Sequence, residues 1–305
     1  MTHRAATSIA LAATLTTLGL AAAAASLVGA RDTEVRLCDD YAGIPPGWPQ
    51  NPAAGMVQVR LQGADGRRRT LRVDATEVTN AQFAAFVAAT GYHTQAEQAG
   101  ASAGFVKPGS GVMLHGAADW WTLVEGAYWR APEGPGSTLE GRMNQPVVHV
   151  TRADAQAYAA WHGTRLPTEA EWEAAAGASA PGSKGEPRDR AGQPLANYWQ
   201  GLFPYGDNAE DGFSGRAAVG CYTANASGVF DAIGNVWEWT ADDFGGDSQW
   251  HGHGDPVAAV HAGLIKGGSY LCAETYCARY RSTARHSLEI DLGTSHVGFR
   301  TVRDG

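Results

Sequence analysis

The sequence has few basic residues and no strongly basic segment. Its 305 residues contain 23 Lys and Arg against 31 Asp and Glu, which gives a formal net charge of −8. Nucleic-acid binding needs clustered Lys and Arg side chains that neutralise phosphates, so this composition argues against a nucleic-acid partner. The short basic run "GRRR" at Gly66 to Arg69 is expected at the tip of a hairpin.

Long apolar runs are also missing after the first 30 residues. Residues 1–30 begin with "MTHR", continue as an uncharged apolar run, and are followed by Arg31. This pattern predicts a secretory signal peptide, with an uncleaved membrane anchor as the alternative, because the run is long enough to span a bilayer. We therefore expect an exported protein, periplasmic or secreted, with no stable membrane insertion after signal cleavage.

Cysteine is scarce as well. The chain has four cysteines, Cys38, Cys221, Cys272 and Cys277. Paired cysteines persist as disulfides in an exported protein. Four residues separate Cys272 from Cys277. The two can therefore form a structural disulfide, bind a metal ion or take part in a redox site. Cys38 and Cys221 are either a second disulfide or two free thiols.

Regular helical periodicity is sparse, whereas glycine (39) and tryptophan (10) are plentiful. We expect an α+β, loop-rich fold in which aromatic side chains anchor irregular backbone. Residues 31–55 form a Pro/Gly-rich leader, and residues 56–305 form a single domain. Alternating apolar and polar residues around "GADG" predict a β-hairpin at 56–79. Capping residues and terminal glycines predict helices at 79–91, 151–163 and 168–177.

Four segments resemble the formylglycine-generating enzymes, also called the sulfatase-modifying factor family. They are "GTRLPTEAEWEAAA" (163–176), "GNVWEWT" (234–240), "GGSYLCAETYCARYR" (267–281) and "GFRTV" (298–302). The resemblance covers about residues 56–303. It implies a single catalytic domain with low regular secondary structure, related in fold to C-type-lectin-like domains.

The resemblance implies an oxygen-dependent oxidoreductase. Such enzymes convert a cysteine of a target protein, in a Cys-x-Pro-x-Arg type motif, to Cα-formylglycine with O2. Carried onto this chain, the family's active cysteines are Cys272 and Cys277, which would bind Cu(I). Cu(I) is a soft ion that prefers thiolate ligands, so two free thiolates suit it. Ser269 and Tyr276 would position oxygen and substrate.

The same resemblance implies a peptide groove and an unfolded protein or peptide as partner, such as a sulfatase. Trp120 matches a tryptophan of the groove wall, and His296 is the second substrate-binding candidate. Three positions depart from the family, because Leu123 replaces a proline, Gly293 a serine and His296 an asparagine. We expect a monomer.

Two structural calcium sites are also implied. Ca²⁺ takes about 6–8 oxygen ligands, and mixed sets of carboxylates, amides and carbonyls suit it. The first site would use the side chains of Asn197 and Asp211 with the carbonyl oxygens of Tyr198 and Phe213. The second would use the side chains of Asp231 and Glu238 with the carbonyl oxygens of Gly234 and Val236.

Two other functions remain open. One is an oxidase of the same fold that acts on another exported peptide or on a siderophore-type substrate, which the changes at Gly293 and His296 favour. The other is a non-catalytic, lectin-like binding module, since a fold does not fix a function. The presence of both Cys272 and Cys277 argues against the binding module.

Overall fold

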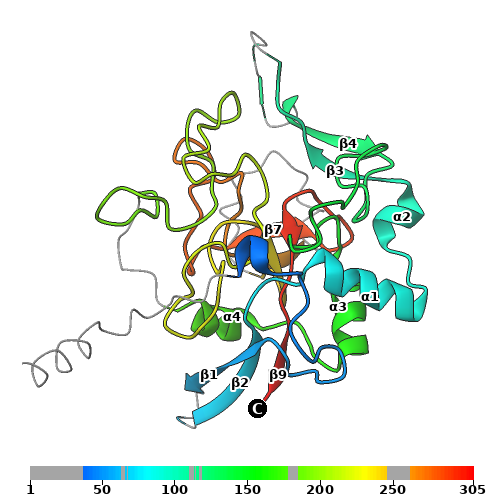
Figure 1. The fold of residues 1–305 in the computed structure, drawn as a ribbon. Helices are drawn as coiled ribbons and strands as arrows, with labels where there is room; N and C mark the ends of the chain where they lie inside the picture. The colour runs from blue at the N-terminus through cyan, green and yellow to red at the C-terminus, as the bar shows by residue number, and fades with distance from the viewer. Residues whose placement is uncertain are drawn as a thin grey trace, which may run out of the picture. The chain divides into compact units, whose positions relative to one another are not determined.

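The computed structural model describes residues 37–62, 66, 68–109, 113, 115–116, 119–177, 185–245 and 262–305. The predicted signal peptide at 1–30 lies outside these ranges. None of the helices within them is long and apolar enough to cross a membrane. The fold is the expected α+β arrangement, in which short helices and strands are joined by long irregular segments (Figure 1).

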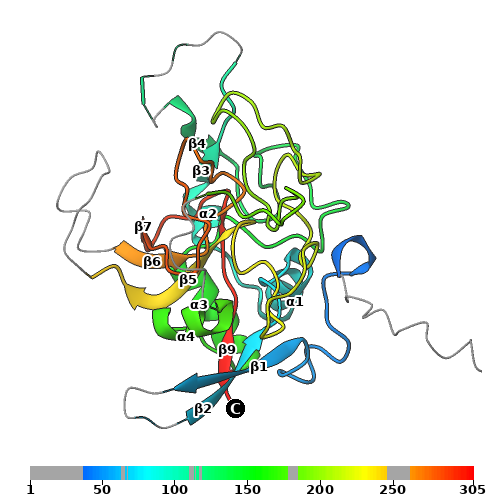
Figure 2. The same cartoon turned by 90° about the vertical axis from the view of Figure 1, so that its left-hand side faces the viewer.

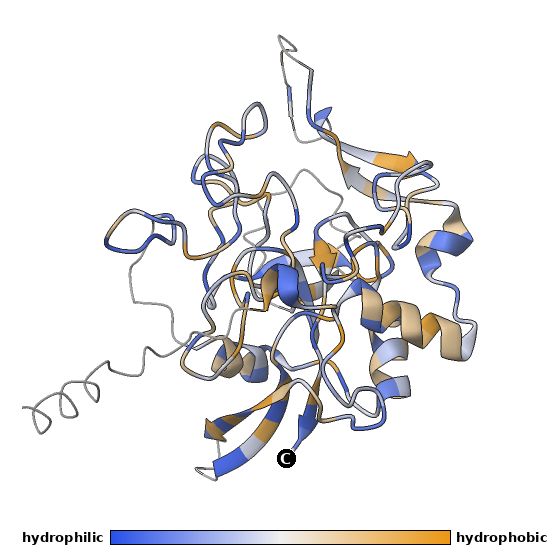
Figure 3. Cartoon of the chain, viewed as in Figure 1, coloured by the Kyte–Doolittle hydropathy of each residue, from blue (hydrophilic) through white to orange (hydrophobic). Residues whose placement is uncertain are grey.

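The predicted hairpin is present as strands β1 (Met56–Gln62) and β2 (Arg68–Asp74), which pair antiparallel. Strand β9 (Val302–Asp304) adds to the other edge of β2. Hydrophilic and hydrophobic residues alternate along β1 and β2 (Figure 3). The apolar members, Val59, Leu71 and Val73, are buried together with Val302 of β9. Alternation thus fixes which face of this sheet meets the core.

A second sheet carries the segments that hold the cysteines. It contains β5 (Trp237–Asp243), β6 (Ala262–Lys266), β7 (His286–Glu289) and β8 (Val297–Gly298), in the order β7-β6-β5-β8. Figure 2 shows β5, β6 and β7 side by side. The chain between β6 and β7 contains both Cys272 and Cys277, so this sheet fixes the two ends of the cysteine loop. A separate two-stranded sheet pairs β3 (Ala101–Phe105) with β4 (Trp121–Glu125).

Each helix begins at a threonine that forms a capping box. The helices are α1 (Asn80–Thr90), α2 (Gln95–Ala99), α3 (Arg152–His162) and α4 (Glu169–Ala176), and a 3-10 turn, η1, spans Cys38–Asp40. In α4, Thr168 accepts from the N–H of Glu171, whose side chain accepts from the N–H of Thr168. Such a cap satisfies two backbone donors that the helix itself leaves unpaired. The three helices expected from the sequence are confirmed, whereas α2 was not expected.

Aromatic side chains form the centre of the core. Phe83 of α1 lies 5.1 Å from Trp129 and 6.1 Å from Tyr158 of α3, between ring centroids. Trp48, from the Pro/Gly-rich leader, is also buried and lies 5.8 Å from Trp161. A disulfide joins Cys38 of the leader to Cys221, which settles the two alternatives for this pair. Residues 37–55 are therefore held against the rest of the fold by both a covalent bond and burial.

Candidate active site

A tight loop brings Cys277 back to Cys272. The N–H of Ala273 donates to the carbonyl oxygen of Tyr276 at 2.9 Å, and the N–H of Ala278 donates to that of Ala273 at 3.0 Å. Cys277 itself has a φ of 70°, a left-handed conformation that a non-glycine residue seldom adopts. Such conformations cluster at functional sites, where the surrounding hydrogen bonds hold them in place.

The two cysteines are free thiols. Cys272 is buried and Cys277 is half-buried. Burial raises the pKa of Cys272, and its hydrogen bond to the Cys277 sulfur adds to the rise. The same hydrogen bond lowers the pKa of Cys277, and the Arg279 guanidinium lowers it further. The pair is therefore asymmetric, with Cys277 as the sulfur that loses its proton first.

The residues before the loop approach it closely. Gly268 has a φ of 82°, and a Cβ there would lie 3.1 Å from the carbonyl oxygen of Arg279. Only glycine combines that conformation with that contact. Ser269 is fully buried, and its Oγ accepts from the N–H of Leu271 at 3.2 Å. The close approach at Gly268 therefore places the 267–272 segment directly against Arg279 and Tyr280.

An aromatic wall stands beside the cysteines. Tyr276 stacks on Phe203 with ring centroids 4.3 Å apart and an interplanar angle of 5°. Trp120 meets the Tyr276 ring edge-on at 5.8 Å and the Phe203 ring at 5.8 Å. Burial raises the pKa of Tyr276, so its hydroxyl stays protonated at neutral pH. The structure thus places Trp120, which the resemblance assigned to the groove wall, against Tyr276 of the cysteine loop.

His296 lies beside Trp121, and its ring is already engaged by Thr294 and Trp121. Its Nδ1 is 2.9 Å from the Oγ1 of Thr294, and its ring lies 4.7 Å from that of Trp121. Burial, together with the nearby His286 and His149, lowers the pKa of His296 to about 3. The ring is therefore neutral at physiological pH, and it supports Trp121 with one face.

These features match one protein family. The family model for the sulfatase-modifying factor enzyme 1-like domain matches residues 35–305. The chain belongs to this family. It is 44% identical over 296 residues to the formylglycine-generating enzyme of Thermomonospora curvata, covering 86% of this chain and 97% of that protein. The formylglycine-generating enzyme of Streptomyces coelicolor is 42% identical over 299 residues, covering 86% and 94%. An inactive Cα-formylglycine-generating enzyme 2 of Bos taurus is 39% identical over 268 residues, covering 81% and 84%.

Two members of the first calcium set that the family implies, Tyr198 and Asp211, share one hydrogen-bond donor. The side-chain amide of Gln200 donates through Nε2 to the Asp211 carboxylate at 2.9 Å and also to the carbonyl oxygen of Tyr198. Asn197 donates through Nδ2 to the carbonyl oxygen of Gly215 at 2.8 Å, which leaves its Oδ1 as an acceptor. The Tyr198 carbonyl and the Asp211 carboxylate therefore lie within reach of one group, and both are oxygen ligands of the kind that Ca²⁺ takes.

The second implied set fits less well, because Glu238 already has partners. Its carboxylate accepts from Arg300 Nε at 2.7 Å, from Arg300 Nη2 at 2.6 Å and from Trp172 Nε1 at 2.7 Å. Asp231 accepts from the N–H of Gly220 at 2.6 Å. Glu77 is fully buried nearby, and its Oε2 has no hydrogen-bond partner within the described residues. Its other oxygen, Oε1, accepts from Asn235 Nδ2 at 3.1 Å, so the carboxylate with one unpaired oxygen in this region is Glu77 and not Glu238.

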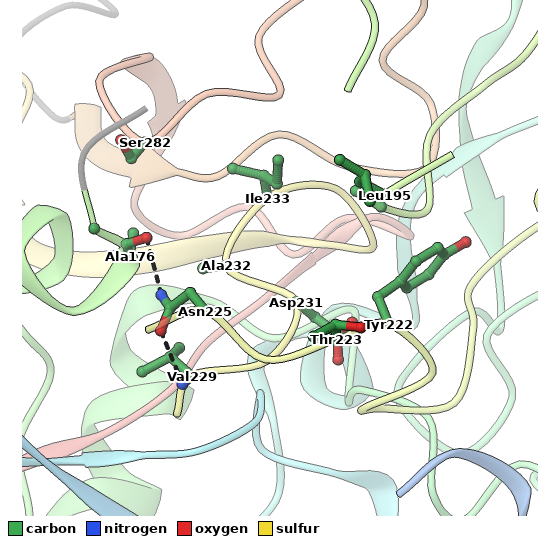
Figure 4. A pocket seen from close by; sticks show the side chains of 12 residues that line it. Ala176, Leu195, Tyr222, Thr223, Asn225, Val229, Asp231, Ala232, Ile233 and Ser282 are labelled. Atoms are coloured by element: carbon green, nitrogen blue, oxygen red, sulfur yellow. Dashed lines mark hydrogen bonds between the residues drawn. The ribbon is translucent and has the colours of Figure 1, made fainter. Parts of the chain in front are cut away.

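A cavity of about 210 Å³ lies apart from the cysteine loop. Asn225 crosses its floor and donates to the carbonyl oxygen of Ala176 at 2.9 Å (Figure 4). Ser282 and Asp231 also line it, but neither active cysteine does. The two free thiols therefore do not line this cavity.

Arg279 lies only two residues after Cys277, but no role was predicted for it from the sequence. Its guanidinium and its backbone N–H both contact the Cys277 sulfur. A basic residue just after a cysteine was the available signal. It was not decisive because sequence spacing alone does not show which way the chain turns after Cys277.

Proposed function

We propose that this protein generates formylglycine, converting a cysteine of an exported target protein to Cα-formylglycine with O2 as the oxidant. The observation that carries the proposal is the pair of unbridged thiols, Cys272 and Cys277, beside an aromatic wall. The high identity to named formylglycine-generating enzymes over nearly the whole chain supports it. A disulfide at this place would leave no sulfur able to bind a metal or to meet an incoming thiol.

We propose Cu(I) as the cofactor, held by the sulfurs of Cys272 and Cys277. The donor set fits, because soft thiolates select Cu(I) and a two-sulfur site leaves room for another thiolate. When bound, Cu(I) would supply a soft centre for a substrate thiolate and for O2. The lowered pKa of Cys277 favours its thiolate form, and Arg279 stabilises that charge. Cys272, whose pKa is raised, would have to lose its proton to serve as the second thiolate ligand.

The remaining site residues would act on the substrate. The Tyr276 hydroxyl is a proton donor beside the cysteines, and its ring is fixed by Phe203. Ser269 fixes the backbone that precedes Cys272, because its Oγ accepts from the N–H of Leu271. Trp120 offers an apolar face at which a peptide side chain can lie, and its contact with Tyr276 places that face next to the cysteine loop.

For calcium, we propose that Asn197, Tyr198, Asp211 and Phe213 hold one structural ion. For the second, we propose Asp231 with the carbonyl oxygens of Gly234 and Val236, and with Glu77 taking the place expected of Glu238. Two buried carboxylates that face one another repel unless a proton or a cation lies between them. Asp231 raises the pKa of Glu77, after burial itself, which agrees with such a pair.

One observation favours the alternative of another exported peptide or a siderophore-type substrate. Gly293 and His296 alter the groove wall, and the Nδ1 of His296 is already engaged by Thr294. An inactive relative at 39% identity keeps the binding-module alternative open as well. Both alternatives are separated from the first by activity on a defined peptide.

The test is to load the purified full chain with Cu(I), supply O2 and a Cys-x-Pro-x-Arg peptide, and measure the peptide mass. Conversion of thiol to aldehyde supports formylglycine generation. Copper binding without conversion supports another substrate. If the reduced protein does not bind copper, the binding module is favoured. Cys277→Ser serves as the matched control, since it changes one atom and should abolish conversion.

A further inference from the structure

The leader is attached to the fold along one short stretch of backbone, residues 217–221, which we call the linking segment. The N–H of Leu37 donates to the carbonyl oxygen of Gly220 at 3.2 Å. The next residue of the leader, Cys38, forms the disulfide with Cys221 at the end of the linking segment. The leader therefore contacts one side of the linking segment through both a hydrogen bond and a covalent bond.

The linking segment also donates to a pair of buried acids. The N–H of Gly220 donates to Asp231 Oδ2 at 2.6 Å. The N–H of Ala217 donates to Asn235 Oδ1 at 3.0 Å, and Asn235 Nδ2 in turn donates to Glu77 Oε1 at 3.1 Å. Because an amide has one oxygen and one NH2 group, the bond from Ala217 determines which end of the Asn235 side chain faces Glu77. The linking segment thus orients Asp231 directly and Glu77 through Asn235.

The contact between the leader and the linking segment leaves little room for movement. Gly220 has a φ of 74°, and a Cβ there would lie 2.7 Å from the Cβ of Leu37. Asn144 bonds to both sides, since its carbonyl oxygen accepts from the N–H of Val219 at 2.9 Å and its Nδ2 donates to the carbonyl oxygen of Cys38 at 3.1 Å. A displacement of the leader should therefore displace the linking segment as well.

The two acids on the far side of the linking segment need a cation. Glu77 is 0% exposed, Asp231 is 8% exposed, and Glu77 Oε2 has no hydrogen-bond partner within the described ranges. A buried charge without a partner is costly, and two neighbouring carboxylates repel each other. This is the place of the second calcium ion proposed above, with the carbonyl oxygens of Gly234 and Val236.

We propose that the leader determines the affinity of this second calcium site. The disulfide and the backbone of the leader hold the linking segment, and the linking segment holds Asp231 and Glu77 in the orientation that the ion requires. The inference rests on the proposed calcium site. Groups that orient metal ligands from outside change metal affinity by about 10- to 100-fold when they are lost. The coupling is reciprocal, so bound calcium in turn holds the leader against the fold.

The first experiment removes the covalent bond. The double variant Cys38→Ser, Cys221→Ser lacks the disulfide and leaves no unpaired thiol at this place. Calorimetric titration of the chelator-treated full chain with CaCl2 should show one binding step that is about tenfold weaker than in wild type, while near-ultraviolet circular dichroism stays native. Equal affinities would overturn the coupling and leave the calcium sites in place. Wild type that binds no calcium would overturn both, and neither result depends on copper or on peptide conversion.

The second experiment keeps the disulfide and changes the contact. Gly220→Ala places a methyl group against Leu37 and should weaken the same calcium step about tenfold. Gly192→Ala is the matched control, because Gly192 has a φ of 83° and an added Cβ there meets nothing within 4 Å. Backbone strain is then common to both variants, and the control should bind calcium within about twofold of wild type. Equal calcium affinities of the two alanine variants would overturn the proposal.

Discussion

Replacing Glu238 by glutamine should destabilise the fold strongly. Glu238 and Arg300 are each about 1% exposed and form two hydrogen bonds with each other, at 2.6 and 2.7 Å. Glutamine keeps the shape but removes the charge, and its NH2 group would face a guanidinium that also donates. Breaking a buried pair while one charge stays behind costs about 3–5 kcal/mol. The lost acceptor for Trp172 Nε1 adds to that cost.

Urea unfolding of the full chain, in calcium and in a chelator, measures this effect. We expect Glu238→Gln to lose about 3–5 kcal/mol in both solutions, since its partner is Arg300. Glu140→Gln, at an exposed site, should stay within about 0.5 kcal/mol of wild type. A loss that appears only with calcium present would show that Glu238 is a calcium ligand, and a loss below about 1 kcal/mol would refute the buried ion pair.

Three further predictions concern sulfur and protons. Cys272→Ser and Cys277→Ser should each abolish Cu(I) affinity in a competition assay while near-ultraviolet circular dichroism stays native; unfolding of either variant would instead indicate a structural role. Burial lowers the pKa of His149 to about 4, so between about pH 6.5 and 4 only the unfolded chain takes up a proton at this histidine. The free energy of unfolding should therefore fall as pH falls through that window, and His149 should account for a loss of about 2 kcal/mol at pH 5. His149→Gln should flatten the slope of unfolding free energy against pH, and an unchanged slope would contradict the assignment. Reduction of the Cys38–Cys221 disulfide, or Cys221→Ser, should cost about 2–5 kcal/mol in urea unfolding and release residues 37–55 to limited proteolysis; unchanged protection would mean that burial of the leader suffices.

Local signals predicted the parts of the fold that local physics determines. The capping residues Thr151 and Thr168 and the terminal Gly163 mark helix ends because each satisfies backbone groups within a few residues. The β1–β2 hairpin follows from alternation around one turn. Strands β3 and β4 were not predicted, because "ASAGF" has weak alternation and its partner lies far along the chain.

The candidate site was predicted only in part for the same reason. Cys272 and Cys277 are close in sequence, so their proximity in space follows from the short loop between them. The stacking of Tyr276 on Phe203 joins residues that are 73 positions apart, and no periodicity signals it. The partner of Glu238 is likewise distant in sequence, which is why a carboxylate that matched a calcium pattern is bound to Arg300 in the structure.

X-ray absorption of the Cu(I)-loaded full chain tests the central proposal most directly. Two sulfur ligands from Cys272 and Cys277 should be seen without peptide, and one more sulfur should join when the cysteine peptide is added under anaerobic conditions. A copper environment of nitrogen and oxygen, or one that the peptide thiol leaves unchanged, would contradict it.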